Sequence, residues 1–431
     1  MRTVLGFDSW VGGASNFSRL VPELREIGYR LVLIHIGSWG GDEGCPKIEY
    51  LNELEIRDIS YYGRKRFDEI LAIENPAAVL FLSNDVFAHR SFNRYSMLAG
   101  IPTVHIYHGL VNVQALGVGI KHYKVNVFSQ VRYVLRRIPK ALLRVWPCYA
   151  RALYQSGASA SDWVRFLSDI IMMVRGRYIA LAAPDAKTLA ACVYTPADVP
   201  HAVNKYGYSP KDVYAVGNPD LSSFGLSSEQ LGSAIRRSLF MRSEVIYVDT
   251  GLIYAGMVFD GADDYFGHLC ATRDALSKQN LDLVVKLHPD HFRTNFPDRL
   301  RSVGIEVLNN ENFLPRLQEC VVAIVEPSTA SLIPALVGVP LLLARYGKLA
   351  TQAYGPVLLD YPRARLLDDI SALRGVLAEE STQLSETEIH NWIKKNAGPL
   401  PAALMPRRVA EVVHRMVDSS SLSNLQTVGK K

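Results

Sequence analysis

One short segment of the sequence places a basic residue and a histidine where they could bind phosphate. The apolar run Leu283–Leu287 predicts a buried strand, and Pro289 stops it. Lys286 and His288 are alternate residues near its end, so their side chains share one face. An unpaired lysine in a buried strand costs several kcal/mol, so its presence calls for an anionic partner.

A second apolar run delivers a carboxylate and two hydroxyls. The predicted strand Val321–Val325 leads into Glu326, Ser328 and Thr329, and a helix is expected over 328–336. The free N–H groups and the dipole of a helix start favour an anion, although the same hydroxyls could simply cap the helix. Phosphates held at the carboxyl ends of strands indicate a nucleotide-linked substrate in a doubly wound domain.

Other carboxylates also follow predicted strands. Asp249 follows the strand Glu244–Val248 and could be a nucleophile, a base or only the start of a loop. Asp8 follows the first strand and opens a loop that ligands would approach in a doubly wound sheet. In that loop Gly12 and Gly13 allow close backbone approach, and Asn16 can cap the next helix. The loop is no GxGxxG, and a plain glycine turn is the alternative.

Two further polar groups follow strands of the first half. Asp85 and His89 come after one strand, and His108 with Gly109 comes after the next. A glycine behind a histidine predicts a turn that leaves the imidazole uncovered, able to donate to an oxygen or to move a proton.

The elements that must position these residues alternate between strand and helix. The 431 residues, 48% hydrophobic and 21% charged, fit two globular domains. Helical patterns between short apolar strands predict parallel sheets. The predicted fold class is α/β, with two doubly wound Rossmann-like domains facing a cleft. Their expected bounds are 1–225 and 226–418, followed by a polar, disordered tail over 419–431.

A basic helical insert over 121–177 interrupts the first domain. Between Lys121 and Arg151 lie eight basic residues and no Asp or Glu, interleaved with aromatic and branched apolar side chains. This pattern predicts attachment to the inner leaflet of a membrane, with Phe128, Leu143 and Trp146 as apolar anchors. A solvated face or an oligomer contact would use the same residues. Nucleic-acid binding is not favoured, because no recognised module accompanies the basic residues.

Composition narrows the compartment and the chemistry. The five cysteines are scattered, with no CxxC pair and no cluster at metal-ligand spacing, so we expect buried thiols and no metal. No secretory signal and no apolar run of transmembrane length is present. We therefore expect a cytoplasmic protein, peripheral on the inner membrane, that needs no cofactor.

Short motifs of the chain resemble the GT-B superfamily. They are Asn84-Asp85, the stretch 99–104, Tyr107-His108-Gly109, Val216-Gly217-Asn218-Pro219, the stretch 286–289, Glu326-Pro327-Ser328-Thr329 and the stretch 335–340. The likeness spans residues 1 to 350 and is greatest to bacterial surface-polysaccharide enzymes: sialyltransferases and polysialyltransferases, capsule Kdo transferases and CDP-glycerol glycerophosphotransferases. UDP-N-acetylglucosamine 2-epimerases share the Gly-Asn-Pro and Gly-Val-Pro elements.

The resemblance implies a metal-independent glycosyltransferase that builds capsule or lipopolysaccharide. Its donor would be a nucleotide-activated sugar, such as CMP-linked Kdo or a nonulosonic acid, and its acceptor a glycan or lipid-linked saccharide. The nucleotide would be held by Lys286, His288, Pro289, Glu326, Ser328, Thr329 and Asn218. Catalysis would fall to Asp8, as in sialyltransferases, or to Asp249, as in Kdo transferases, with His108 assisting. Gly12, Gly13, Asn16 and Asp85 would line the acceptor side.

Three alternatives stay open. One is an epimerase that acts on a UDP-sugar without an acceptor, and a second is a phosphotransferase of the CDP-glycerol type. The third is a non-catalytic subunit of polysaccharide assembly that keeps the fold for binding.

Overall fold

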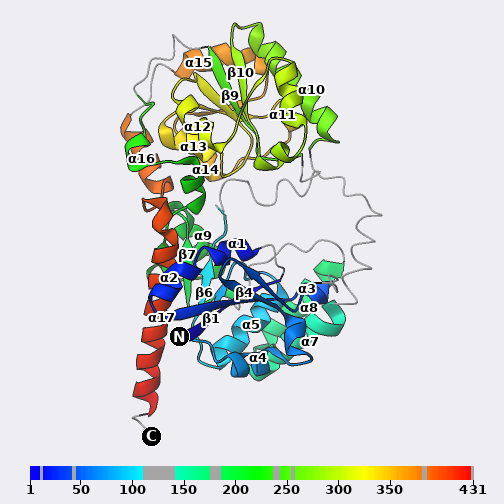
Figure 1. Ribbon diagram of the computed structural model, residues 1–431, viewed down its shortest axis with the longest axis vertical. Helices are drawn as coiled ribbons and strands as arrows, with labels where there is room; N and C mark the ends of the chain where they lie inside the picture. Colours follow the sequence, from blue (N-terminus) through cyan, green and yellow to red (C-terminus); the bar gives the residue numbers. More distant parts are fainter. Residues whose placement is uncertain are drawn as a thin grey trace.

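The computed structural model consists of two α/β domains, one above the other in Figure 1. It describes residues 1–9, 13–40, 45–109, 141–174, 186–235, 243–253, 258–380 and 386–428.

The first domain is built on an eight-stranded sheet in the order β3-β4-β2-β1-β5-β6-β7-β8. All neighbouring strands are parallel except β3 and β4, which pair antiparallel at one edge. The strands are β1 (Arg2–Asp8), β2 (Tyr29–His35), β3 (Ile48–Leu51), β4 (Leu54–Asp58), β5 (Ala78–Phe81), β6 (Thr103–Ile106), β7 (Ala190–Val193) and β8 (Val213–Ala215).

The second domain has a six-stranded, entirely parallel sheet in the order β11-β10-β9-β12-β13-β14. Its strands are β9 (Glu244–Val248), β10 (Asp282–Lys286), β11 (Glu306–Leu308), β12 (Val322–Val325), β13 (Leu341–Ala344) and β14 (Ala364–Leu367). In both sheets the first strand of the domain lies inside and the order reverses beside it, which defines a doubly wound sheet. The predicted fold class, with two Rossmann-like domains, is confirmed.

Helices cover both faces of each sheet, because alternate strand residues must be buried on opposite sides. In β1, Val4 belongs to one apolar cluster and Leu5 to the other. The helices of the first domain include α1 (Ala14–Ser18), α2 (Val21–Glu26), α3 (Gly37–Gly40), α4 (Phe67–Glu74), α5 (Phe87–Leu98), α7 (Trp146–Gln155), α8 (Ala160–Val174) and α9 (Val199–Tyr206). Those of the second include α10 (Ala262–Ser277), α11 (Phe296–Ser302), α12 (Asn310–Leu317), α13 (Leu332–Val337), α14 (Pro356–Leu359), α15 (Leu373–Glu380) and α16 (Glu386–Asn396).

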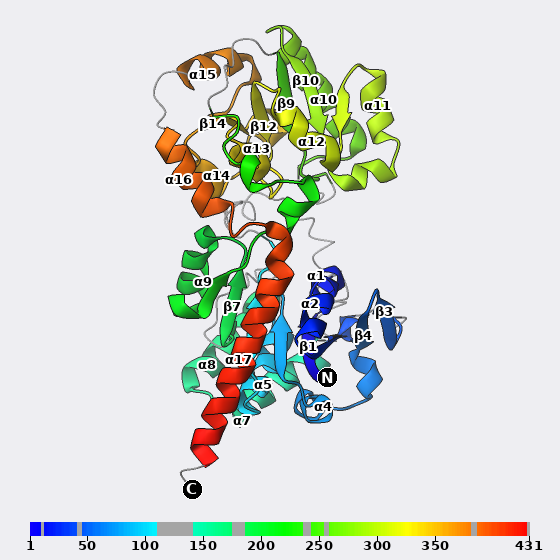
Figure 2. The same ribbon diagram turned by 60° about the vertical axis from the view of Figure 1, so that its left-hand side comes forward.

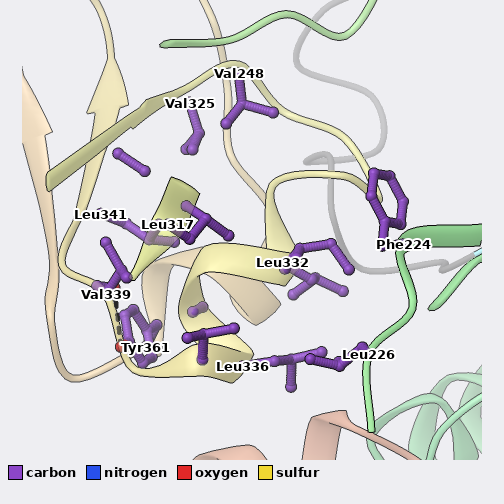
Figure 3. Close-up of a cluster of buried hydrophobic side chains, with 14 of the residues drawn as sticks. Phe224, Leu226, Val248, Leu317, Val325, Leu332, Leu336, Val339, Leu341 and Tyr361 are labelled. Carbon is purple, nitrogen blue, oxygen red and sulfur yellow. Dashed lines mark hydrogen bonds between the residues drawn. The ribbon is translucent and has the colours of Figure 1, made fainter. Parts of the chain in front are cut away.

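The segment that leaves the first domain packs into the core of the second. It begins with the 3₁₀ helix η8 (Pro219–Phe224). Figure 3 shows Phe224 and Leu226 beside Leu332 and Leu336 of α13. The connection is therefore anchored by apolar burial on the second domain, close to where the chain leaves the first.

The last helix, α17 (Met405–Val428), returns to the first domain and runs along it (Figures 1 and 2). Its apolar face, including Val409, Val413 and Val417, is part of the same core as β1, β5 and β7. The prediction that placed all of residues 226–418 in the second domain is thus wrong for this helix. The helix also continues through residues 419–428, where a disordered tail was predicted.

The described part of the insert is a helical layer packed on α5. A π-helical turn, η4 (Ala141–Val145), leads into α7 and then α8, and most of the predicted basic stretch, up to residue 140, lies outside the described residues. The buried guanidinium of Arg90 donates to Asp169 at 2.9 Å and to the Tyr149 hydroxyl. Trp146 is buried in this layer, so its predicted role as a membrane anchor is wrong, whereas Leu143 is 73% exposed.

Candidate functional site

A buried lysine marks the carboxyl edge of the second sheet. Lys286 is the last residue of β10 and is only 2% exposed. No hydrogen bond or ion pair joins its ammonium to another residue that the structure describes. The ammonium lies over the ring of Phe224, 5.3 Å from the ring centre. Burial lowers the pKa of Lys286 to about 8, although the Asp249 charge opposes that shift. The ammonium is therefore still largely charged at neutral pH, and no carboxylate in the described part of the chain pairs with it.

His288 lies beside this lysine and is accessible. Its side chain is 37% exposed, and its Nδ1 accepts the N–H of Asp290 at 3.3 Å. It caps the 3₁₀ helix η10 (Pro289–Arg293), so Pro289 serves as the first residue of that turn. Burial lowers the pKa of the imidazole, which favours its neutral form. A neutral imidazole next to a buried ammonium can donate to phosphate oxygen without adding charge.

Asp249 organises the loops around these two residues. One carboxylate oxygen accepts the Gly251 N–H at 2.8 Å; the other accepts the His288 N–H at 2.8 Å and lies 3.1 Å from Nε2 of His291. Burial would raise its pKa, but the His291 side chain and the two N–H groups outweigh burial and lower it. A buried carboxylate with these contacts is better suited to hold His288 in place than to attack a substrate.

Glu326 occupies the equivalent position after β12 and is fully buried. Its oxygens accept the Tyr247 hydroxyl at 2.7 Å, the Thr250 N–H at 3.0 Å and the Thr250 hydroxyl at 2.7 Å. Burial and the charge of Asp249 raise its pKa to about 8. Glu326 therefore joins the end of β12 to the end of β9 through its hydrogen bonds with Tyr247 and Thr250.

Sequence reasoning did not identify His291, which stands three residues after His288. It is buried against Phe296, with ring centres 4.6 Å apart, while it contacts Asp249. The three-residue spacing between His288 and His291 could have predicted this placement, because a 3₁₀ turn that starts at Pro289 brings residues i and i+3 to one side.

The helix predicted to begin at Ser328 begins four residues later, at Leu332. Ser328 instead accepts the N–H of Ala330 at 3.1 Å within a turn, and Thr329 accepts the N–H of Leu332 through its carbonyl at 3.1 Å. Both side chains are half-buried at the same edge of the sheet as Lys286. The turn still presents hydroxyls there, but the predicted helix start at Ser328 is wrong.

Asn218 lies where the chain crosses between the domains. Its side chain accepts the Asp220 N–H at 3.0 Å and caps η8. Gly217 has a φ of 105°, and a Cβ there would lie 2.9 Å from the carbonyl oxygen of Pro399, so only glycine fits. In the Gly-Asn-Pro motif, Asn218 thus caps the helix that leaves the first domain, and Gly217 allows the close approach of Pro399.

In the first domain, three predicted site residues meet around Leu82. Asp8, at the end of β1, lies so close to the loop that a Cβ on Gly13 would be 2.2 Å from Oδ2 of Asp8 and 2.7 Å from Cδ1 of Leu82. His108 is exposed, and its Nδ1 is 2.8 Å from the Leu82 carbonyl oxygen. The buried His89 comes within 3.5 Å of Asp8.

The other residues predicted for the acceptor side are placed differently. Asp85 accepts the Tyr206 hydroxyl at 3.0 Å and the Lys205 ammonium at 3.2 Å, facing α9. Asn16 lies inside α1 rather than at its cap, because the helix starts at Ala14. Gly12 lies outside the described residues. Among the residues with described positions, no group of three or more His, Cys, Asp or Glu could hold a metal ion.

Comparisons with known proteins give likeness in fold only. No protein-family model and no curated protein sequence matches the chain. Similar solved structures include S. aureus MnaA with UDP, at 10% identity and a TM-score of 0.44, covering 97% of this chain and 97% of that one. The UDP-GlcNAc 2-epimerase of Methanocaldococcus jannaschii, with UDP-GlcNAc and UDP, has 10% identity, coverages of 96% and 100%, and a TM-score of 0.44. The wall teichoic acid polymerase TagF has 8% identity, coverages of 97% and 89%, and a TM-score of 0.45. Values this low assign no function.

Proposed function

We propose that this protein is a glycosyltransferase that uses a nucleotide-activated sugar. The observation that carries the proposal is the buried Lys286 ammonium, unpaired among the described residues, beside the accessible His288 at the carboxyl edge of a doubly wound sheet. A doubly wound sheet binds ligands at this edge, and a buried cation without a carboxylate calls for an anion. A donor diphosphate or monophosphate meets both conditions.

The same groups supply what glycosyl transfer needs. The reaction breaks the bond between the anomeric carbon and a phosphate oxygen and forms one between that carbon and an acceptor hydroxyl oxygen. Negative charge grows on the leaving phosphate, and the hydroxyl gives up its proton. Lys286 would offset that charge and His288 would donate to the phosphate. On the first domain, Asp8 would act as the carboxylate that activates the acceptor, with His108 moving a proton.

The proposed substrates rest on the resemblance of two sequence motifs to those of bacterial sialyltransferases. The pairs His288-Pro289 and Ser328-Thr329 favour a CMP-linked acidic sugar, such as Kdo or a nonulosonic acid, with a bacterial surface glycan or lipid-linked saccharide as acceptor. Transfer to a lipid-linked acceptor fits a protein peripheral on the inner membrane. No helix among those described is long and apolar enough to cross a membrane.

One surface supports the membrane proposal. On α8, Val164, Leu167 and Ile171 form an exposed apolar stripe at helical spacing, and Leu143 is exposed nearby in the sequence. With the basic residues between 121 and 151, which precede α8, the insert combines the apolar and cationic side chains that an anionic bilayer attracts. Co-sedimentation with anionic and neutral vesicles tests it: binding should need anionic lipid and should fall when Leu167→Gln and Ile171→Gln are combined.

A thermal-shift panel of CMP, CDP, UDP and GDP tests the function, because a ligand that binds only the folded state raises the melting temperature. We expect one nucleotide to stabilise the protein and the variant His288→Ala to lose that stabilisation. If CMP alone raises the melting temperature, CMP-sugars are tested next as donors with defined saccharides as acceptors. Stabilisation by UDP, with interconversion of a UDP-sugar in the absence of acceptor, would instead establish an epimerase. No response to any nucleotide would reject the site.

A further inference from the structure

A pocket of about 720 Å³ opens on the first domain, and none of the candidate site residues described above lines it. It lies between α3, the turn that follows β4, the start of α4, and α7 of the insert. Arg144 of η4, just before α7, joins the insert to α3 by donating from its guanidinium to the Ser38 carbonyl at 3.2 Å. Because α3 follows β2 and the turn follows β4, the pocket sits at the carboxyl edge of the sheet that also carries Asp8.

Its rim is strongly basic. Six exposed cations line it: Lys47, Arg64, Lys65, Arg66, Arg144 and Arg151. Only Arg66 has a carboxylate partner among the described residues, in a two-pronged contact with Asp68 at 2.8 and 3.0 Å. None of the described lining residues is acidic; Asp42 and Glu43, next to it in sequence, lie outside the described part of the chain.

Its floor is aromatic. The half-buried Trp39 stacks on Phe67, with ring centres 5.6 Å apart, and the buried Tyr95 lies beside them. A flat apolar floor under a ring of cations suits a ligand that combines sugar faces with negative groups. Leu143, which is 73% exposed, also lines the pocket, but a bilayer surface would call for several such side chains on a flat face rather than a hollow.

We infer that this pocket binds the acceptor of the reaction and that the acceptor is an anionic oligosaccharide, bearing carboxylates or phosphodiesters along its chain. That the ligand is an acceptor rests on the proposed transferase function. That the ligand is anionic rests on the pocket alone. Five cations without a carboxylate partner among the described residues repel one another, so a polyanion that spans them relieves the repulsion and binds more weakly as salt rises.

The test uses the full-length protein without any donor. Isothermal titration with tetragalacturonate, an oligosaccharide with four carboxylates, is compared with the same tetramer as its neutral methyl ester. The double variant Arg64→Gln, Lys65→Gln removes two rim charges. The matched control Lys394→Gln, Lys395→Gln removes two adjacent exposed charges from α16 of the second domain.

We expect the acid to bind, the ester not to bind, and the rim variant to lose about tenfold in affinity while the control keeps it. Equal binding of acid and ester, or equal losses in the two variants, would overturn the inference. So would a rim variant that loses binding only to vesicles of phosphatidylglycerol, because the pocket would then face lipid. The nucleotide thermal shift of the rim variant should stay normal, so failure of the donor site and failure of this pocket are separate results.

Discussion

The ammonium of Lys286 lies 5.3 Å from the ring centre of Phe224, a residue of the segment that connects the two domains. A cation over an aromatic face is attracted to it without being neutralised. Phe224 is in turn packed against Phe313 of the second domain, with ring centres 5.8 Å apart. The connecting segment therefore forms one wall of the candidate phosphate site.

Replacing Lys286 with Met should uncouple binding from stability. We expect nucleotide affinity to fall by at least about tenfold, because a charge-assisted contact to phosphate is lost. The melting temperature should stay the same or rise, since the variant no longer buries an ammonium. Titration calorimetry and thermal melts measure the two effects, and the exposed Lys278→Met is the control. Unchanged affinity in the folded variant would remove Lys286 from the site.

Nucleotide binding should weaken as pH rises through about 8, because burial lowers the pKa of Lys286 to about 8 and the ammonium is lost above it. A bound phosphate favours the charged form, so binding near that pH should take up protons. Calorimetry in two buffers of different ionisation enthalpy detects this uptake. If Lys286→Met shows the same uptake, another group is responsible.

The variant Glu326→Gln should remove a pH-dependent loss of stability. In the unfolded chain Glu326 ionises near 4.5, whereas in the fold its pKa is raised to about 8 by burial and by Asp249. Between these values the unfolded state binds fewer protons, so this group makes stability fall as pH rises. The Gln amide imitates the protonated acid, and its melting temperature relative to wild type should improve from pH 5 to pH 8. A constant difference would mean that Glu326 is ionised in the fold.

Asp249→Asn should act mainly on stability and on the position of His288. An amide cannot accept from both backbone N–H groups and also face His291 as the carboxylate does, so we expect a loss on the order of 2–4 kcal/mol in the free energy of unfolding. Chemical denaturation measures it. A variant of normal stability that binds donor but has lost turnover would instead identify Asp249 as the nucleophile.

Asp8→Asn should spare nucleotide binding and stop transfer. Asp8 lies in the other domain from Lys286, among groups that the structure gathers around Leu82. We expect turnover to fall by orders of magnitude with the donor affinity unchanged. Near-normal turnover would place the catalytic carboxylate elsewhere.

Strand ends were the part of the site that sequence predicted well. Apolar runs such as Val321–Val325 end close to where their strands end, and β10 ends at Lys286, because buried parallel strands leave a continuous apolar signal. Since the carboxyl ends of parallel strands meet at one edge, Lys286, Asp249 and Glu326 could be grouped before any contact was known.

What each of these groups does could not be predicted in the same way. Asp249 and Glu326 looked alike in sequence. In the fold, His291 and two N–H groups lower the pKa of Asp249, whereas burial and the charge of Asp249 raise the pKa of Glu326. Those contacts come from loops folded against each other, and no local pattern encodes them. The rim of the basic pocket could not be predicted from the sequence either, because Lys47, Arg64 and Arg151 come from distant parts of the chain.

The return of α17 to the first domain has a consequence for how the protein is made. Val409, Val413 and Val417 complete an apolar cluster whose other members, such as Val4 and Leu31, precede the second domain in the chain and are synthesised before it. A ribosome must therefore finish the whole second domain before the first can complete this cluster. Until then that unfinished surface stays open to chaperones, and a chain stopped before Met405 would leave it open for good.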